Sequence, residues 1–260
     1  MSGIEPIAQS QVTDAVTSEP PPLTPARVLL GRAGSSYRTS TMLQLRADHA
    51  AARDALHERI DLDADPMRAL VERFGLFEVA TEAGSPAEHL ARPDRGRRLT
   101  AASIDRLGAD CPAPVDLQLA VGDGLSAAAV RTQVPVLLPL LHEAASARGL
   151  TLGRPVFIRH CRVGVLNDLG ASIDAEVVAL LVGERPGLAT AESLSAYLAW
   201  RPRPGDTDAQ RNLISNIHAA GVSPDEAAGR ILGLVEQMRL HRRSGFELRE
   251  STSSSPAVGH

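Results

Sequence analysis

The sequence contains no lysine. Its 27 basic residues are all arginines, 31 acidic residues outnumber them, and the formal net charge is −4. A basic stripe is the electrostatic signature of proteins that bind nucleic acid, and the arginines here are scattered along the chain instead. We therefore expect no nucleic-acid partner.

Long apolar runs, cysteine pairs and a secretory signal are also missing. No apolar run approaches the roughly 20 residues that span a bilayer, so we expect no membrane segment. Only Cys111 and Cys161 occur, without a CxxC or zinc-type spacing, and the N-terminal residues lack the basic start and apolar stretch of a signal peptide. With 43% hydrophobic and 22% charged residues among 260, the chain is expected to be a folded, soluble protein of the reducing cytoplasm.

Motifs of enzymes that act alone are absent as well. The sequence has no GxSxG nucleophile elbow, no HExxH and no P-loop lysine motif. These absences argue against a self-contained hydrolase, metalloprotease or kinase. We assign no catalytic residue and no metal ligand.

The first part of the chain is predicted to be a flexible tail followed by a mainly helical region. Residues 1–26 are polar and interrupted by proline, so no apolar burial offsets the entropy of ordering them. In residues 27–110, Thr39 or Ser40 can cap a first helix, and a second helix should end at Gly75. Residues 91–99 should form a loop and residues 101–110 a further helix.

Residues 111–245 show a different pattern, in which short apolar runs alternate with helical ones. Strands are predicted in VDLQLAV, PVFIRH, EVVALLV and SLSAYLAW, and helices from about Leu125, through VLLPLLHEAASARG and near residues 165–171. Such alternation is typical of βαβ units around a buried parallel sheet. The fold class we predict is α/β: a mainly helical N-terminal part followed by a Rossmann-like, mostly parallel sheet domain.

The last helix has the clearest start signal in the sequence. Ser223 is a good N-cap, Pro224 suits the first helical position, and Glu226 completes a capping box. Gly245 is expected to stop the helix, and residues 246–260 to form a second flexible tail. Helical spacing predicts one buried face, made of Ala228, Ile231, Leu232, Val235 and Met238.

The segment from Gly122 to Ala127 reads GDGLSA and joins a predicted strand to a predicted helix. It matches the GxGxxA form of a dinucleotide-binding turn. That fingerprint also needs an acidic residue near the end of the next strand, where this sequence has Arg159 and His160. We favour a glycine turn that only joins strand to helix, and keep open a loop that faces a ligand.

A second loop, GERPG at residues 183–187, also follows a predicted buried strand. For an arbitrary protein, a charged pair beside a Pro-Gly turn is best interpreted as solvated. Open α/β sheets bind ligands beyond the carboxyl ends of their strands, however, and the Glu184 carboxylate could accept hydrogen bonds from a ligand's amide groups there. Both interpretations stay open on these residues alone.

The segment from Asn216 to Gly221 reads NIHAAG and is similar to the DxHxxG box with which some cobalamin proteins present a histidine to cobalt. Here Asn216 replaces the aspartate that would orient the imidazole. We therefore interpret His218 as a structural residue that hydrogen-bonds near the start of the Ser223 helix.

Taken together, several segments between about Gly31 and Gly245 resemble the small (light) subunit of ethanolamine ammonia-lyase, and they occur in that family's order. They are GRAGSSYRT with LQLRADHAAARDAL, ARPDRGRRL, GDGLS, RVGVLNDLG, LLVGERPGL with AESLSAY, and ISNIHAAGVSPDEAA. Their combined occurrence is far more specific than any single motif.

The resemblance implies a subunit that has no activity alone. Together with a large subunit that provides the main binding site for ethanolamine, the family's small subunit converts ethanolamine to acetaldehyde and ammonia by radical chemistry of adenosylcobalamin. Residues 111–245 would form the cobalamin-binding domain, with contacts at Val163, Glu184 and Leu213. The family can have cysteine at the position of Leu213, so that contact is expected to be apolar packing or backbone.

In the same family cobalamin keeps its own base on the cobalt, so His218 need not ligate metal. A cytoplasmic location is expected, and enclosure in a bacterial microcompartment is left open. Two alternatives also stay open from the residues: a Rossmann-like oxidoreductase that binds a nicotinamide cofactor through GDGLSA, and a non-catalytic adaptor of a metabolic complex.

Overall fold

The computed structural model describes residues 32–111, 114–187 and 189–250. The predicted flexible tail at residues 1–26 lies outside this part of the chain. A two-stranded ribbon, β1 (Arg32–Ala33) with β2 (Ser36–Tyr37), precedes helix α1 (Thr39–Ala55). No helix among the described residues is long and apolar enough to cross a membrane.

One mixed sheet of six strands organises the rest of the molecule. The first four strands in its spatial order are parallel, and β7 runs antiparallel to both of its neighbours. The order across the sheet is β3 (Phe77–Ala80), β5 (Val156–Arg159), β4 (Val115–Gly122), β6 (Ala175–Gly183), β7 (Leu194–Trp200) and β8 (Asn212–Ile217). A mostly parallel α/β sheet is thus confirmed.

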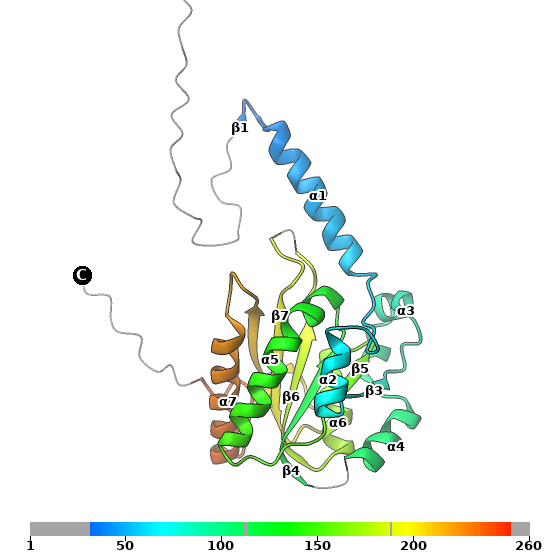
Figure 1. Ribbon diagram of the computed structural model, residues 1–260, viewed down its shortest axis with the longest axis vertical. Helices are drawn as coiled ribbons and strands as arrows, with labels where there is room; N and C mark the ends of the chain where they lie inside the picture. The colour runs from blue at the N-terminus through cyan, green and yellow to red at the C-terminus, as the bar shows by residue number, and fades with distance from the viewer. Residues whose placement is uncertain (1–31, 112–113, 188, 251–260) are drawn as a thin grey trace, which may run out of the picture.

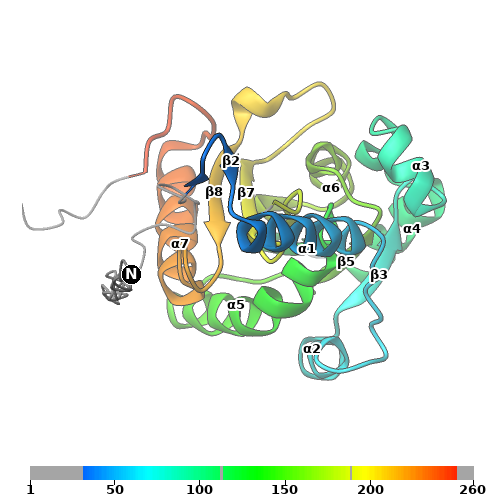
Figure 2. The ribbon, with the colours of Figure 1, turned by 90° about the horizontal axis from the view of Figure 1, so that it is seen from above.

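Helices cover both faces of the sheet (Figures 1 and 2). On one face lie α2 (Met67–Phe74), α5 (Ala127–Ala147) and α7 (Pro224–His241). Toward the other lie α4 (Ala101–Asp110) and α6 (Leu166–Ser172), with α3 (Pro86–Ala91) beside them. The strands are covered on both sides, which explains why their sequences are continuous apolar runs.

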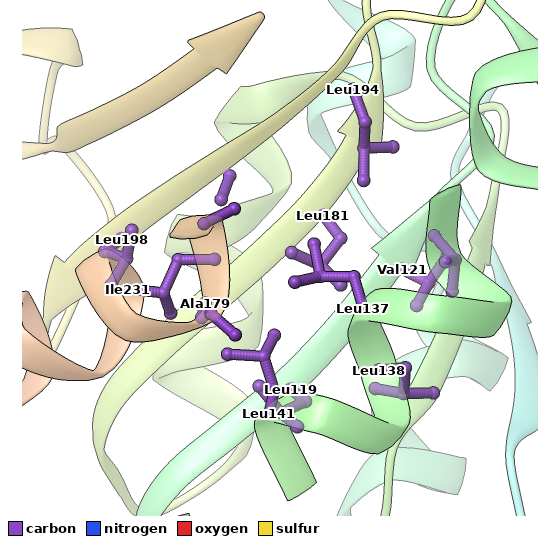
Figure 3. Packing of buried hydrophobic residues seen from close by; sticks show 14 of the residues in the cluster. Leu119, Val121, Leu137, Leu138, Leu141, Ala179, Leu181, Leu194, Leu198 and Ile231 are labelled. Carbon is purple, nitrogen blue, oxygen red and sulfur yellow. The ribbon is translucent and has the colours of Figure 1, made fainter. Parts of the chain in front are cut away.

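The core forms two layers because side chains of a strand point alternately to opposite faces. In β6, Val177, Ala179 and Leu181 belong to the cluster under α5 and α7. Val178, Leu180 and Val182 belong to the cluster on the α6 side. Figure 3 shows the first layer, in which Leu137 and Leu141 of α5 and Ile231 of α7 face the strands. Each such side chain contributes about 1.5–3 kcal/mol on burial.

The α5 region differs from prediction. The sequence pattern predicts two helices between residues 125 and 149, but α5 is one helix with Pro135 and Pro139 inside it. Each interior proline costs about 3 kcal/mol relative to alanine. Val134, Leu137, Leu138 and Leu141 are fully buried on either side of the prolines. Burial of these side chains offsets the cost and keeps the helix continuous.

Several predicted boundaries also need correction. Helix α1 begins at Thr39, with Arg38 at the cap position and no side-chain cap, so neither Thr39 nor Ser40 caps it. Helix α7 ends at His241, where Arg242 takes the left-handed conformation expected of Gly245. Strands β3 and β8 and the short helix α3 were not predicted. Because β3 is an edge strand of the sheet, the N-terminal part contributes a strand to the sheet as well as helices.

The predicted C-terminal tail begins too early. Leu248 is 5% exposed and packs in the core, and its carbonyl accepts a hydrogen bond from Asn212 Nδ2 at 2.7 Å. Arg230 forms a bidentate ion pair with Glu250. Residues 246–250 are therefore held to the body, and the remainder of the predicted tail lies outside the described residues.

Helix α1 projects from the body of the molecule (Figure 1). Its only buried residues are Ala52 and Ala55, near its last turn. The chain that follows it is anchored at the sheet, where Arg159 Nη1, at the end of β5, donates to the Ile60 carbonyl at 2.7 Å. Helix α1 therefore stands at the carboxyl edge of the parallel strands.

Candidate functional site

The candidate site is a cleft at the carboxyl ends of β4, β5 and β6. The chain leaves β4 toward β5 on one side and leaves β6 toward β7 on the other. Loops that diverge in this way open a crevice, which is where open α/β sheets bind ligands. Here the crevice encloses ≈ 290 Å³ and is lined by, among others, Leu125, Val163, Glu184, Tyr197, Leu213 and Ser215.

All three residues that the family resemblance implies as cofactor contacts line this one cleft. Val163 comes from the loop after β5, Glu184 from the residue after β6, and Leu213 from β8. They are separated by 21 and 29 positions in the sequence. The fold therefore gathers residues that no local motif could place together.

The Glu184 carboxylate is held in place by three donors. Ser195 Oγ donates to Oε1 at 2.6 Å, Ser193 Oγ donates to Oε2 at 2.8 Å, and the backbone N–H of Asn216 donates to Oε1 at 2.9 Å. Two carboxylate oxygens offer about four acceptor positions in all. One position on Oε2 is therefore left for a donor in the cleft.

Ser193 and Ser195 were missed by sequence reasoning, although a signal was present. They stand two residues apart at the start of the predicted strand SLSAYLAW. Residues at this spacing point to the same face of a strand. Two hydroxyls on one face beside a glutamate loop indicate a carboxylate clamp.

Leu213 forms an apolar wall of the cleft together with Tyr197. These residues are paired in register across β7 and β8. Ile214, the next residue, is buried under α7, so Leu213 points to the opposite face, where it is 47% exposed. Burial, followed by the charges of Asp208 and Glu184, raises the pKa of Tyr197, so its phenol stays neutral beside the leucine.

Val163 opens a short 3-10 helix, η2 (Val163–Val165), that leads into α6. The preceding Arg162 donates its backbone N–H to the Gly96 carbonyl at 2.8 Å. Gly96 belongs to a second 3-10 helix, η1 (Arg95–Arg97), within the segment that the sequence predicts as a loop. The ARPDRGRRL and RVGV segments thus support one another at the edge of the cleft.

The GDGLSA turn has a structural role. It joins β4 to α5, as predicted, and Ser126 caps the helix by accepting from the Ala129 N–H at 3.1 Å. Asp123 accepts the backbone N–H groups of His160 and Cys161 at 2.7 and 2.8 Å. Gly124 has φ +61°, and an added Cβ would lie 2.3 Å from the Gly183 carbonyl oxygen. These contacts tie the loops after β4, β5 and β6 together.

His218 uses both ring nitrogens within its own loop. Nδ1 accepts the Ala220 N–H at 3.2 Å, so Nε2 carries the proton and donates to Asn216 Oδ1 at 2.7 Å. The ring is buried, with 4% exposure. The loop from Asn216 to Val222 runs directly into the Ser223 cap of α7, and the structural interpretation of His218 fits this arrangement.

The described residues include no group of three or more histidine, cysteine or acidic side chains that could hold a metal ion. Cys161 is fully buried, and this burial raises the pKa of its thiol well above the usual value. A thiol in this state packs as a small apolar side chain and is a poor nucleophile. Glu184 is the only acidic residue among the described residues that line the cleft.

Comparison with known proteins decides the family. A family model described as ethanolamine ammonia-lyase light chain (EutC) matches residues 17–249. The chain belongs to the ethanolamine ammonia-lyase light-chain family.

Proteins named ethanolamine ammonia-lyase small subunit are similar to this chain over most of its length. The one from Clostridioides difficile strain 630 is 38% identical over 226 residues, which are 87% of this chain and 75% of the relative. The one from Listeria innocua serovar 6a is 40% identical over 227 residues, with the same shares. The one from Clostridium acetobutylicum is 36% identical over 232 residues, 89% of this chain and 93% of the relative.

In this chain, most of the segments that carry the resemblance meet around the cleft, whereas GRAGSSYRT and LQLRADHAAARDAL lie in β1, β2 and α1. The GDGLS, RVGV and GERPG segments contribute lining residues, and ARPDRGRRL supports RVGV. The NIHAAG segment provides the Asn216 N–H that binds Glu184.

Proposed function

We propose that this chain is the small subunit of an adenosylcobalamin-dependent ethanolamine ammonia-lyase and that its cleft binds one side of cobalamin. The observation that supports this most directly is the Glu184 carboxylate, which three donors hold with one acceptor position left over toward the cleft. Membership of the light-chain family supports the same conclusion.

The residues of the cleft fit the chemistry of a corrin. A corrin has a broad apolar face surrounded by amide side chains. Val163, Tyr197 and Leu213 supply apolar surface for the face, and the free acceptor position of Glu184 suits an amide N–H. With 47% of Leu213 exposed, a ligand or partner can bury more of it.

The contribution of this chain is to bind and orient. The Cys161 thiol in the cleft is buried with a raised pKa, and the Glu184 carboxylate is already bound by three donors. When bound, adenosylcobalamin supplies the radical chemistry of the ammonia-lyase reaction. Leu213 and Val163 would exclude water from the cofactor surface, and Glu184, already fixed by its serines, would set the cofactor's rotation in the cleft. Ethanolamine would be bound mainly by the large subunit.

The alternatives are less well supported. A nicotinamide cofactor needs the GDGLSA turn to approach a pyrophosphate, but its Asp123 and Gly124 are used in contacts to neighbouring loops. Arg159, at the end of the next strand, pairs with Glu78 and offers no acid to a ribose. No observation favours a non-catalytic adaptor. A cytoplasmic location, with or without a microcompartment, stays an expectation of the resemblance.

Reconstitution tests the division of labour. The full chain with adenosylcobalamin should release no acetaldehyde from ethanolamine, and activity should appear when the large subunit is added. A coupled assay with alcohol dehydrogenase measures the product. Acetaldehyde release by the small chain alone, at a rate that the large subunit does not increase, would refute the proposal.

A further inference from the structure

A second cavity, lined by arginine, adjoins the cleft. It encloses ≈ 630 Å³ and shares Arg162 and Val163 with the cleft, so the two meet at these residues. Its other arginines are Arg97, Arg98 and Arg211. They come from η1, the loop that follows it and the residue before β8, so only the folded chain brings them together.

Two of these arginines are already paired. Arg98 Nε lies 3.4 Å from Asp168, whose Oδ2 also accepts the Leu99 N–H at 2.8 Å. Arg211 donates to Asp208 at 2.5 Å and to Asn167 at 2.9 Å. Its side chain is only 4% exposed, yet its Nε has no acceptor.

Arg162 and Arg97 keep donors that the described parts of the chain do not satisfy. Arg162 donates Nη2 to the His89 carbonyl at 2.9 Å, but its Nε is buried without an acceptor. Arg97 has no acceptor or ion-pair partner among residues 32–111, 114–187 and 189–250. Its stem lies over Gly164, where an added Cβ would be 2.7 Å from Arg97 Cγ.

The positive charges of these two arginines repel each other, so a bound anion would stabilise both. Burial, and next the charge of Arg97, lower the pKa of Arg162. The acids of the cavity do not relieve this repulsion, because Asp168 and Asp208 bind Arg98 and Arg211, and Asp206 accepts the Arg203 N–H at 2.8 Å. The cavity therefore has two guanidinium groups available for an oxyanion from outside the chain.

We propose that Arg97 and Arg162 bind the phosphodiester of the cofactor's nucleotide loop, an inference that rests on the proposed function. Cobalamin's amide side chains are neutral, and the phosphodiester is the anion at its periphery. Arginine binds such oxyanions through paired, charge-assisted hydrogen bonds. The arginine cavity shares Arg162 and Val163 with the cleft, so it adjoins the proposed position of the corrin.

The test compares cobalamin with cobinamide, a corrinoid that keeps the corrin ring and its amides but lacks the nucleotide loop and its phosphate. Affinities are measured by calorimetric titration of the full chain in complex with the large subunit. Arg97→Ala should weaken cobalamin binding about tenfold and leave cobinamide binding unchanged. Arg162→Lys, which keeps a charge but removes the Nε donor, should show the same selectivity.

A matched control is Arg92→Ala, which removes an exposed arginine that pairs with Asp94 and is not among the residues that line the cavity. It should change neither affinity. Equal weakening of both corrinoids by Arg97→Ala, or no change in either, with an unchanged circular dichroism spectrum, would overturn the assignment of the phosphodiester. Failure of the unmodified complex to bind either corrinoid would instead refute the proposed function.

Discussion

Two carboxylates at neighbouring strand ends have different surroundings. Asp123 follows the last residue of β4, and Glu184 follows the last residue of β6. Asp123 accepts only backbone N–H groups, from the loop after β5. Glu184 is bound mainly by serine hydroxyls and lines the open cleft. Asp123 thus stabilises the edge of the sheet through backbone donors, whereas the proposed function gives Glu184, with its side-chain donors, the role of binding a ligand.

The largest expected effect tests the structural side of this comparison at Gly124. Gly124→Ala places a Cβ against the Gly183 carbonyl at a positive φ, so the unfolding free energy should fall by more than about 3 kcal/mol. Gly149→Ala is the matched control, because Gly149 has φ +72° but nothing within 4 Å of an added Cβ. It should cost about 1–2 kcal/mol. Equal losses in urea titrations would mean that the close approach to Gly183 is unimportant.

Asp123→Ala should be the next most damaging change. It leaves the N–H groups of His160 and Cys161 without their acceptor, which costs about 2–4 kcal/mol of stability. Urea unfolding followed by circular dichroism measures this loss. A variant as stable as the parent chain would show that water replaces the carboxylate, and Asp123 would no longer differ from Glu184.

Glu184→Ala should weaken cofactor binding and leave the stability of the fold nearly unchanged, the reverse of what is expected for Asp123→Ala. Cobalamin affinity of the reconstituted complex should fall by about 1.5–3 kcal/mol, the typical effect of losing a hydrogen bond to a charged group, and the fold should survive. Glu192→Ala, at an exposed position in the same β6–β7 connection, is the control. Unchanged affinity with a normal circular dichroism spectrum would remove Glu184 from the site.

Acid should lower the stability of the fold around Asp123, because His89 nearby becomes protonated. Its Nε2 donates to the Gly124 carbonyl at 2.9 Å, and burial, followed by the charge of Arg162, lowers its pKa below 6.5. Because the unfolded chain then binds more protons, stability should fall as pH decreases from 6.5 to the folded-state pKa, by at most about 1.4 kcal/mol per pH unit. His89→Gln should flatten this slope. A parallel pH profile in both proteins would exclude His89 as its source.

The smallest expected effect concerns His218, in the loop that binds Glu184. We predict that its imidazole does not ligate the cobalt of the cofactor. Both ring nitrogens already have partners in the loop that also binds Glu184. The electron spin resonance spectrum of cob(II)alamin in the complex should therefore keep the nitrogen splitting of the cofactor's own base when the protein's histidines carry ¹⁵N. An altered splitting would identify a protein imidazole as the ligand.

The parts of the fold that follow local rules could be predicted from the sequence. The strands β4, β5, β6 and β7 are apolar runs, and α7 starts at Ser223 with its predicted apolar face buried. Strand β8 was missed because its exposure alternates irregularly at the sheet edge, where Leu213 faces the cleft. The two prolines of α5 made the sequence look like two helices. In the fold, packing of the surrounding leucines outweighs the free-energy cost of the prolines, and the helix is continuous.

The candidate site was predictable only through the family resemblance. Val163, Glu184 and Leu213 have no local pattern that joins them, and the strand order brings them to one cleft. The arginine cavity had no sequence signal, because Arg97, Arg162 and Arg211 lie in three separate segments. Whether an unpaired guanidinium is buried depends on tertiary packing, which spacing alone does not encode.

The exposure of helix α1 affects how fast its backbone amides exchange hydrogen when the chain is alone. It contains 17 residues but buries only two alanines, whereas most of the stability of helices in proteins comes from packing of an apolar face. Its unfolding therefore disturbs little of the core, so its backbone amides should exchange with deuterated solvent much faster than those of β4 and β6. The same amides report directly on any surface that covers α1, because only external contacts can slow their exchange to the rate of the body.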